Sequence, residues 1–172
     1  GTGALLPVFA KDVLNVGPVG LGWLGSAQAL GALVMGLAQG IRPPPKHMGN
    51  AFLASVAIYG VAMTVFGFST NYLLSFAALF ISGGMDNFSV VVRHSVVQIY
   101  TPDELRGRVS AVNRVFVDSS NKLGTVESSL LAGATTPGFT LVFGGLVTIG
   151  VVLFARAKFK EIRALRTLDA PK

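Results

Sequence analysis

Long apolar stretches alternate with short polar segments along the whole chain. Three stretches, residues 13–41, 48–85 and 128–155, contain no charged residue, and each exceeds the roughly 20 residues that cross a bilayer as a helix. Clusters of polar, Pro and Gly residues at 69–72 and 135–138 predict turns inside two of them. Because backbone in lipid must satisfy its own hydrogen bonds, the spans are predicted to be α-helices. The five predicted spans lie near residues 19–41, 51–68, 72–98, 109–134 and 139–155.

The first ten residues are also apolar, but they are too few to cross a bilayer alone. They carry neither a basic segment nor a cleavage site, so they are not a signal peptide. We interpret them as the last turns of another span whose upstream part is missing. The alternative is a short protein whose first segment lies in the membrane interface. The predicted fold is an all-α membrane protein with five transmembrane helices and a truncated sixth.

Composition favours a membrane protein over a soluble one. Hydrophobic residues make up 51% of the 172 residues and charged residues only 13%, against the roughly 25% typical of globular proteins. The mean hydropathy is +0.62. Cysteine is absent, and His47 and His94 lack metal-ligand spacing. Without a Ser–His–Asp arrangement, a metal motif or a Gly-rich phosphate loop, we expect no enzyme, no cofactor and no metal.

The net charge of +6 does not indicate a nucleic-acid partner, because the basic residues flank apolar runs instead of gathering on a polar surface. Cytoplasmic loops of membrane proteins are rich in Lys and Arg. The loops on one side hold only Lys11, whereas ten basic residues lie on the other: Arg42, Lys46, Arg106, Arg108, Arg156, Lys158, Lys160, Arg163, Arg166 and Lys172. We predict that this second side, with the C-terminus, is cytoplasmic. In residues 158–172 the apolar Phe159, Ile162 and Leu165 fall on one helix face among basic residues, which predicts a short amphipathic tail helix on the inner leaflet.

The first full span is dense in small residues, which favours close helix packing in lipid. They recur at a spacing of four: Gly22 and Ser26, Ala27 and Gly31, and Ala32, Gly36 and Gly40. Gln28 in the same span needs either a hydrogen-bonding partner or a polar cavity, and the sequence leaves both open.

Charged residues in the third and fourth spans are the candidate chemistry. Asp86, Arg114, Asp118, Lys122 and Glu127 lie at membrane depth, where each charge costs roughly 2.5–3.5 kcal/mol on insertion scales. They must therefore be paired or hydrated. The spacing of Arg114, Asp118 and Lys122 predicts an i,i+4 ladder on one helix side. Asn121 lies between this ladder and a second stripe made of Asn113, Ser120 and Glu127.

The short connection between the third and fourth spans makes them antiparallel and predicts a cross-helix pair between Asp86 and Lys122. Two interpretations remain: an ion-pair network that only fixes helix packing, or a cavity that binds a substrate or a proton. We favour the cavity, because ionisable residues inside membranes are usually functional.

The connection itself, residues 101–104, has the form of a capping box with Thr101 as N-cap and Glu104 as its reciprocal acceptor. Arg106 and Arg108 follow, and the sequence leaves open whether they anchor the loop to head groups or contribute, with Asp103, to a cytoplasmic gate.

These residues resemble the C-terminal half of major facilitator superfamily (MFS) transporters, in particular bacterial enterobactin-exporter-like and macrolide-efflux-like proteins. Residues 83–133 carry the matching order: Asp86, Arg93, Thr-Pro-Asp-Glu, Arg-Gly-Arg, Ser-Asn, Leu-Gly and Glu127. The loop at residues 40–46 stands where that family often has a gating motif rich in Gly and Arg. Residues 1–157 would then be the C-terminal half, from the end of span seven through span twelve, and residues 158–172 its cytoplasmic tail.

The resemblance implies twelve spans in two six-helix halves, alternating access, and proton-coupled efflux of small siderophore-like or drug-like molecules across the bacterial inner membrane. The partners would be the lipid bilayer, the substrate, and an N-terminal half or a second copy. Expected pathway or proton-coupling residues are Asp86, Asp118, Lys122, Glu127, Asn121 and Gln28; expected charge partners are Arg93 and Arg114. The alternative is a truncated, non-transporting segment or scaffold whose charges only stabilise packing.

Overall fold

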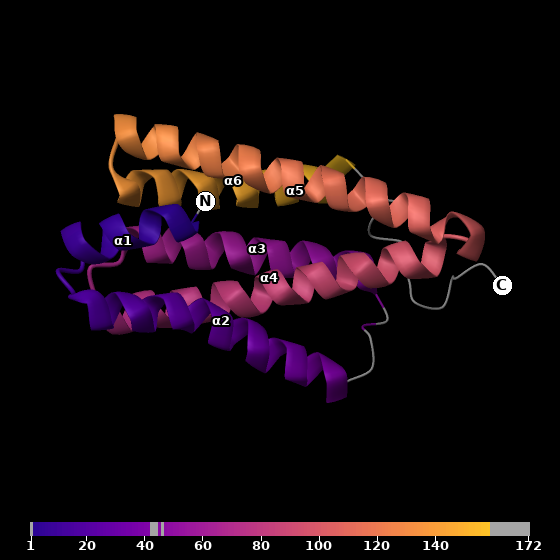
Figure 1. Cartoon of the computed structure of the whole chain (residues 1–172), viewed down its shortest axis with the longest axis horizontal. Coiled ribbons are helices and arrows are strands. Elements are labelled where there is room, and N and C mark those ends of the chain that lie inside the picture. Colours follow the sequence, from indigo (N-terminus) through magenta and orange to yellow (C-terminus); the bar gives the residue numbers. More distant parts are fainter. Residues whose placement is uncertain (1, 42–44, 46, 159–172) are drawn as a thin grey trace.

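The computed structural model describes residues 2–41, 45 and 47–158. This part contains six helices and no strand (Figure 1): α1 (Thr2–Asp12), α2 (Pro18–Ile41), α3 (Met48–Phe68), α4 (Tyr72–Tyr100), α5 (Asp103–Ala134) and α6 (Pro137–Lys158). Each of the five predicted spans lies within one helix, and the apolar N-terminal residues form the short helix α1. The predicted all-α architecture is confirmed.

Both predicted turns form where polar side chains replace backbone partners. At the first, the Asn71 side chain accepts hydrogen bonds from the backbone N–H groups of Leu73 and Leu74, at 2.9 and 3.3 Å, and so caps α4. The Ser75 hydroxyl donates to the Ser69 hydroxyl, at 3.0 Å, across the same turn. At the second, α5 ends at Ala134 and α6 begins at Pro137, a residue that suits the first turn of a helix.

Four helices are long and apolar enough to cross a membrane: α2, α3, α4 and residues Gly138–Lys158 of α6. Large apolar side chains on their outer surfaces, such as Trp23, Leu37 and Phe154, are exposed in the isolated chain. Such exposure is expected of residues that face lipid. Helix α5 has 32 residues, but its charges and polar groups keep it out of this set, so its crossing remains a prediction.

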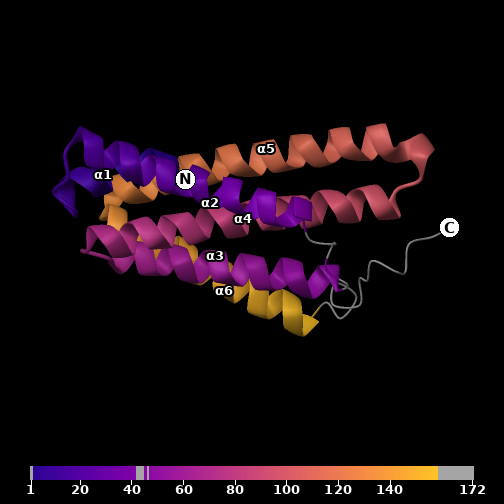
Figure 2. The same cartoon turned by 90° about the horizontal axis from the view of Figure 1, so that it is seen from below.

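Helix α4 lies at the centre and packs along α2 and α3, and α6 packs along the other side of α3 (Figure 2). The short helix α1 closes one end, where it touches α2, α5 and α6. The hydrophobic core lies at that end, with the rings of Phe9 and Phe66 4.5 Å apart at their centroids. Its buried members are Leu5, Phe9, Ala10, Leu24, Ala27, Met63, Phe66, Ala78, Leu79 and Leu141. None of them belongs to α5.

Glycines allow two helix pairs to approach closely. Between α2 and α4, a Cβ on Gly31 would overlap the carbonyl of Phe80, and one on Gly83 would overlap the carbonyl of Gln28. The predicted close packing of α2 through Ala27 and Gly31 is confirmed, since both residues are buried and Gly31 lies against the backbone of α4. By contrast, Gly22 and Gly40 face open space in this chain.

A second seam, which the spacing of small residues in the first full span did not predict, joins α3 to α6. A Cβ on Gly60 would lie 3.0 Å from the Gly145 carbonyl oxygen, and one on Gly67 would lie 3.0 Å from that of Gly138. Because the hydrophobic effect does not drive helices together within lipid, close backbone packing contributes much of the free energy of helix association.

The α3–α6 seam predicts a contrast between two glycines of α6. Replacing Gly145 by Ala puts a methyl group 2.7 Å from the Gly60 carbonyl oxygen and should destabilise the protein by about 1–3 kcal/mol, as overpacking does. Gly150→Ala is the matched control, since it meets nothing within 4 Å, and it should be neutral or slightly stabilising. The check is unfolding of the full-length protein in mixed micelles; equal effects of the two substitutions would contradict the seam.

Candidate functional site

The connection between α4 and α5 differs from the predicted capping box. Thr101 is the C-cap residue of α4, and Pro102 occupies the N-cap position of α5, which begins at Asp103 without a side-chain cap. Arg106 holds the turn instead. Its Nη2 forms an ion pair with Asp103 Oδ1 at 2.7 Å and donates to the backbone carbonyl of Gln98 at 3.3 Å.

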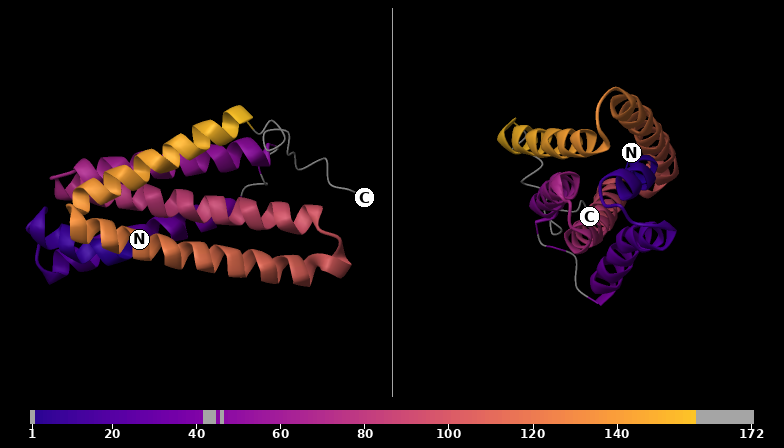
Figure 3. Two further views of the ribbon diagram at one scale, coloured as in Figure 1. Left: turned by 90° about the horizontal axis from the view of Figure 1, so that it is seen from above. Right: turned by 90° about the vertical axis from the view of Figure 1, so that its left-hand side faces the viewer.

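Beyond this turn, α4 and α5 run side by side with little direct contact (Figure 3). Two hollows lie between them, of about 670 and 490 Å³. Five residues line both: Arg93, Val97, Asn113, Val117 and Asn121. We call the two hollows together the α4–α5 groove. It occupies the half of the molecule away from the hydrophobic core.

The walls of the groove differ in chemistry. The larger hollow is mostly apolar and adds Val109, Val112, Phe116, Ser120 and Arg108 to the shared residues. The second is more polar and adds Val90, His94, Gln98, Ser110, Arg114 and Asp118. Arg93 projects between the two, and its Nε is the one buried side-chain nitrogen or oxygen in the described residues that has no hydrogen-bond partner.

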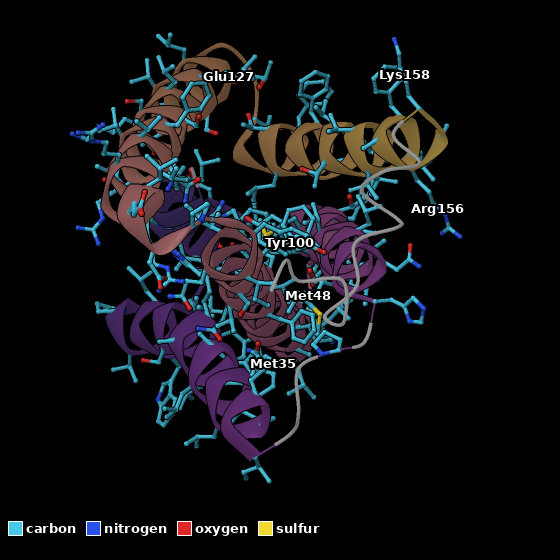
Figure 4. The ribbon with its side chains drawn as sticks, turned by 90° about the vertical axis from the view of Figure 1, so that its right-hand side faces the viewer. Met35, Met48, Tyr100, Glu127, Arg156 and Lys158 are labelled. Atoms are coloured by element: carbon cyan, nitrogen blue, oxygen red, sulfur yellow. The ribbon has the colours of Figure 1, made fainter. Side chains whose placement is uncertain are left out.

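The structure brings some predicted site residues together and leaves others apart. Arg93, Arg114, Asp118 and Asn121 line the groove, with Arg108 nearest the α4–α5 turn. The others lie outside its lining: Asp86, Lys122, Glu127 and Gln28. Glu127 lies on the side of α5 away from α2 in Figure 4.

The predicted pair between Asp86 and Lys122 does not form. Among the described residues, the ion pair that forms is the one between Arg106 and Asp103. Asp86 and Lys122 are both exposed. At 100° per residue Lys122 lies roughly 140° around α5 from Val117, which faces α4, so its side chain projects away from α4. Asp86 and Lys122 therefore do not neutralise each other.

A polar contact that sequence reasoning missed joins α2 to α4. Gln39 Nε2 donates to Asn87 Oδ1 at 3.2 Å, and both side chains are half-buried. The sequence signal for this contact is one amide side chain in each of two apolar helices. Gln28 is half-buried, and its backbone carbonyl lies close to Gly83.

Two predicted features lie outside the described residues. They are most of the loop at 40–46 and the tail helix, of which only Lys158 is described. Figure 4 shows Arg156 and Lys158 at the end of α6, the last described turn before that tail.

Comparison with known proteins identifies the family to which this chain belongs. The model of an MFS family described as transmembrane secretion effector matches residues 2–170, nearly the whole chain. The chain belongs to this family of MFS transporters. As an MFS protein it is a membrane protein, and the two relatives below are named as a transporter and as an efflux pump.

Two relatives have similar sequences. The uncharacterized MFS-type transporter YvqJ of Bacillus subtilis (strain 168) is 27% identical over 157 residues, 89% of this chain and 37% of that protein. The multidrug efflux pump Tap of Mycolicibacterium fortuitum is 27% identical over 147 residues, 84% of this chain and 36% of that protein. The chain thus spans a little over a third of the length of these relatives. No solved structure matches the chain.

The contact between Gln39 and Asn87 predicts a measurable coupling between two helices of this MFS protein. Hydrogen bonds between membrane helices contribute about 0.6 kcal/mol on average and at most about 1.7 kcal/mol. A double-mutant cycle with Gln39→Ala and Asn87→Ala should give a coupling energy in that range for unfolding of the full-length protein. Strict additivity of the two substitutions would show that this hydrogen bond does not contribute to stability.

Proposed function

We propose that this chain is the C-terminal part of a secondary transporter that exports small amphipathic molecules by alternating access, coupled to protons, across the bacterial inner membrane. Its C-terminus would face the cytoplasm. The MFS family supports transport, and the name of one relative, a multidrug efflux pump, supports export. Ten basic residues on one side of the predicted spans support the orientation.

The observation that carries the proposal is the surface of α5. Arg114, Asp118 and Lys122 are exposed near the middle of a 32-residue helix, and none forms an ion pair in the described chain. Their cost in hydrocarbon would be several kcal/mol in total, so this side of α5 must meet water or charged groups. Such a side suits the wall of a polar pathway through the membrane.

The other wall must come from protein outside this chain. The chain covers 37% of its relative YvqJ, which leaves room for an N-terminal six-helix half, and a second copy is the alternative. Inverted repeats packed around a central site are the usual plan of secondary transporters. The α5 surface and the exposed face of α2 would then meet that second wall.

Within this pathway each candidate residue has a proposed part. Asp86, Asp118 and Glu127 would carry protons, and Arg93 and Arg114 would act as their charge partners. Lys122, Asn121 and Gln28 would line the pathway. Asp103, Arg106 and Arg108 would form the cytoplasmic gate, with Arg106 holding the turn through its contacts with Asp103 and Gln98.

The scaffold alternative receives less support. It requires the charged residues of the predicted spans to form ion pairs that stabilise helix packing. The ion pair in the described residues, Arg106–Asp103, lies at the α4–α5 turn instead. The scaffold alternative also predicts that loss of Asp86 lowers folded yield, whereas the transport proposal predicts loss of flux alone.

The proposal predicts that carboxylates at membrane depth are needed for efflux and not for insertion. Asp86→Asn or Glu127→Gln in the full-length protein should abolish proton-driven efflux from cells, while folded yield in membranes stays at the parent level. Asp12→Asn is the matched control, because Asp12 is an exposed carboxylate at the end of α1, and it should retain efflux. Parent-level efflux in both neutral variants would overturn the assignment of these residues.

A further inference from the structure

The α4–α5 groove carries an excess of positive charge along its length, from the α4–α5 turn into the predicted spans. Its walls hold three arginines, Arg93, Arg108 and Arg114, and one acid, Asp118. None of these four residues forms an ion pair in the described chain. A positively charged groove is complementary to an anion. The attraction between opposite charges is stronger where the dielectric constant is lower than that of water.

Arg93 gives the groove a specific point of recognition. A guanidinium has five N–H donors in a rigid fork that matches carboxylate, phosphate and sulfonate oxygens. The Nε of Arg93 is buried and has no acceptor, although buried donors are nearly always satisfied. Arg93 lies on α4 and lines both hollows, whereas Arg108 and Arg114 each line one of them.

The rest of the larger hollow is apolar. Val97, Val109, Val112, Phe116 and Val117 surround the same space that Arg93 enters. Its volume of about 670 Å³ lies within the range of small-molecule sites, about 300–1,000 Å³. A ligand that satisfies both walls has an anionic head beside Arg93 and an apolar body along the valines and Phe116.

We infer that the α4–α5 groove binds amphipathic anions, with Arg93 and Arg114 holding the head group, and that such anions are a substrate class of the transporter. This inference deepens the proposed function and rests on it. It assigns the arginines a role toward the ligand, in addition to the role of charge partners for Asp86 and Asp118. It also predicts discrimination between ligands that differ only in head-group charge.

The test uses two fluorescent probes with one apolar body and opposite heads, dansylaminohexanoate and dansylcadaverine. Full-length protein in nanodiscs of phosphatidylcholine is titrated with each, and empty nanodiscs give the background. We expect the anionic probe to bind at least about tenfold more tightly, since its head group forms a hydrogen bond between charged groups with Arg93 and the cationic head does not. Equal affinities, or no binding above background because other protein fills the groove, would overturn the inference.

Variants assign the preference to the groove. Arg93→Gln should weaken binding of the anionic probe by at least about tenfold and leave the cationic probe unchanged. Arg93→Lys should restore part of the loss, because the charge returns without the planar fork. Arg156→Gln is the matched control at the end of α6, outside the groove, and should bind both probes like the parent. If Arg93→Gln does not fold, Arg114→Gln, with its exposed side chain, should lower the same preference.

Two further measurements separate this inference from other outcomes. Loss of anionic-probe binding when phosphatidylglycerol is added to the nanodiscs would assign the groove to a lipid head group and overturn the substrate role. Proton-driven movement of either probe into inverted vesicles tests transport itself. Transport with no effect of Arg93→Gln on head-group preference would contradict the anion site alone, whereas no transport of any compound would contradict the proposed function.

Discussion

Close backbone contact between helices is the constraint on which the rest of this structure depends. In lipid, apolar side chains gain little by leaving one apolar environment for another, so helices cohere through tight packing and a few polar contacts. Gly31 and Gly83 let α2 meet α4, and Gly60 and Gly145 let α3 meet α6. Together with the contact between α3 and α4, these seams join four helices into one continuous row.

Helix α5 lies outside that row and differs from it in composition. It contributes no residue to the core and touches its neighbours only lightly, through α1, α4 and α6. Its apolar side, with Leu123 69% and Leu130 70% exposed, suits lipid, and its charged side suits water. The helix with the least packing within the chain is therefore the one whose surface is most available to other molecules.

Much of the fold could be predicted from the sequence, because in a membrane protein long uncharged runs and polar breaks mark helices and turns directly. Asn71 caps α4 at the predicted break, and Ala27 and Gly31 pack as expected. The errors concern contacts between helices. The rotation of α5 relative to α4, which separates Asp86 from Lys122, is not encoded in the periodicity of either helix. The prediction that Thr101 caps α5 is wrong, because the two-residue connection leaves Thr101 at the end of α4. The α3–α6 glycines and the Gln39–Asn87 bond needed knowledge of which helices are neighbours.

The central claim, that the polar side of α5 lines a water-filled pathway, is tested most directly by thiol accessibility. The chain has no cysteine, so single cysteines can be introduced at Asn121, in the groove, and at Val126, on the apolar side about 7.5 Å further along α5. Both are placed in the full-length protein after any cysteines outside this chain have been replaced. A membrane-impermeant sulfonated thiol reagent is then applied to inverted and right-side-out vesicles. The account predicts that the reagent labels Asn121→Cys and spares Val126→Cys; equal labelling of the two, or labelling of Val126→Cys alone, would contradict it.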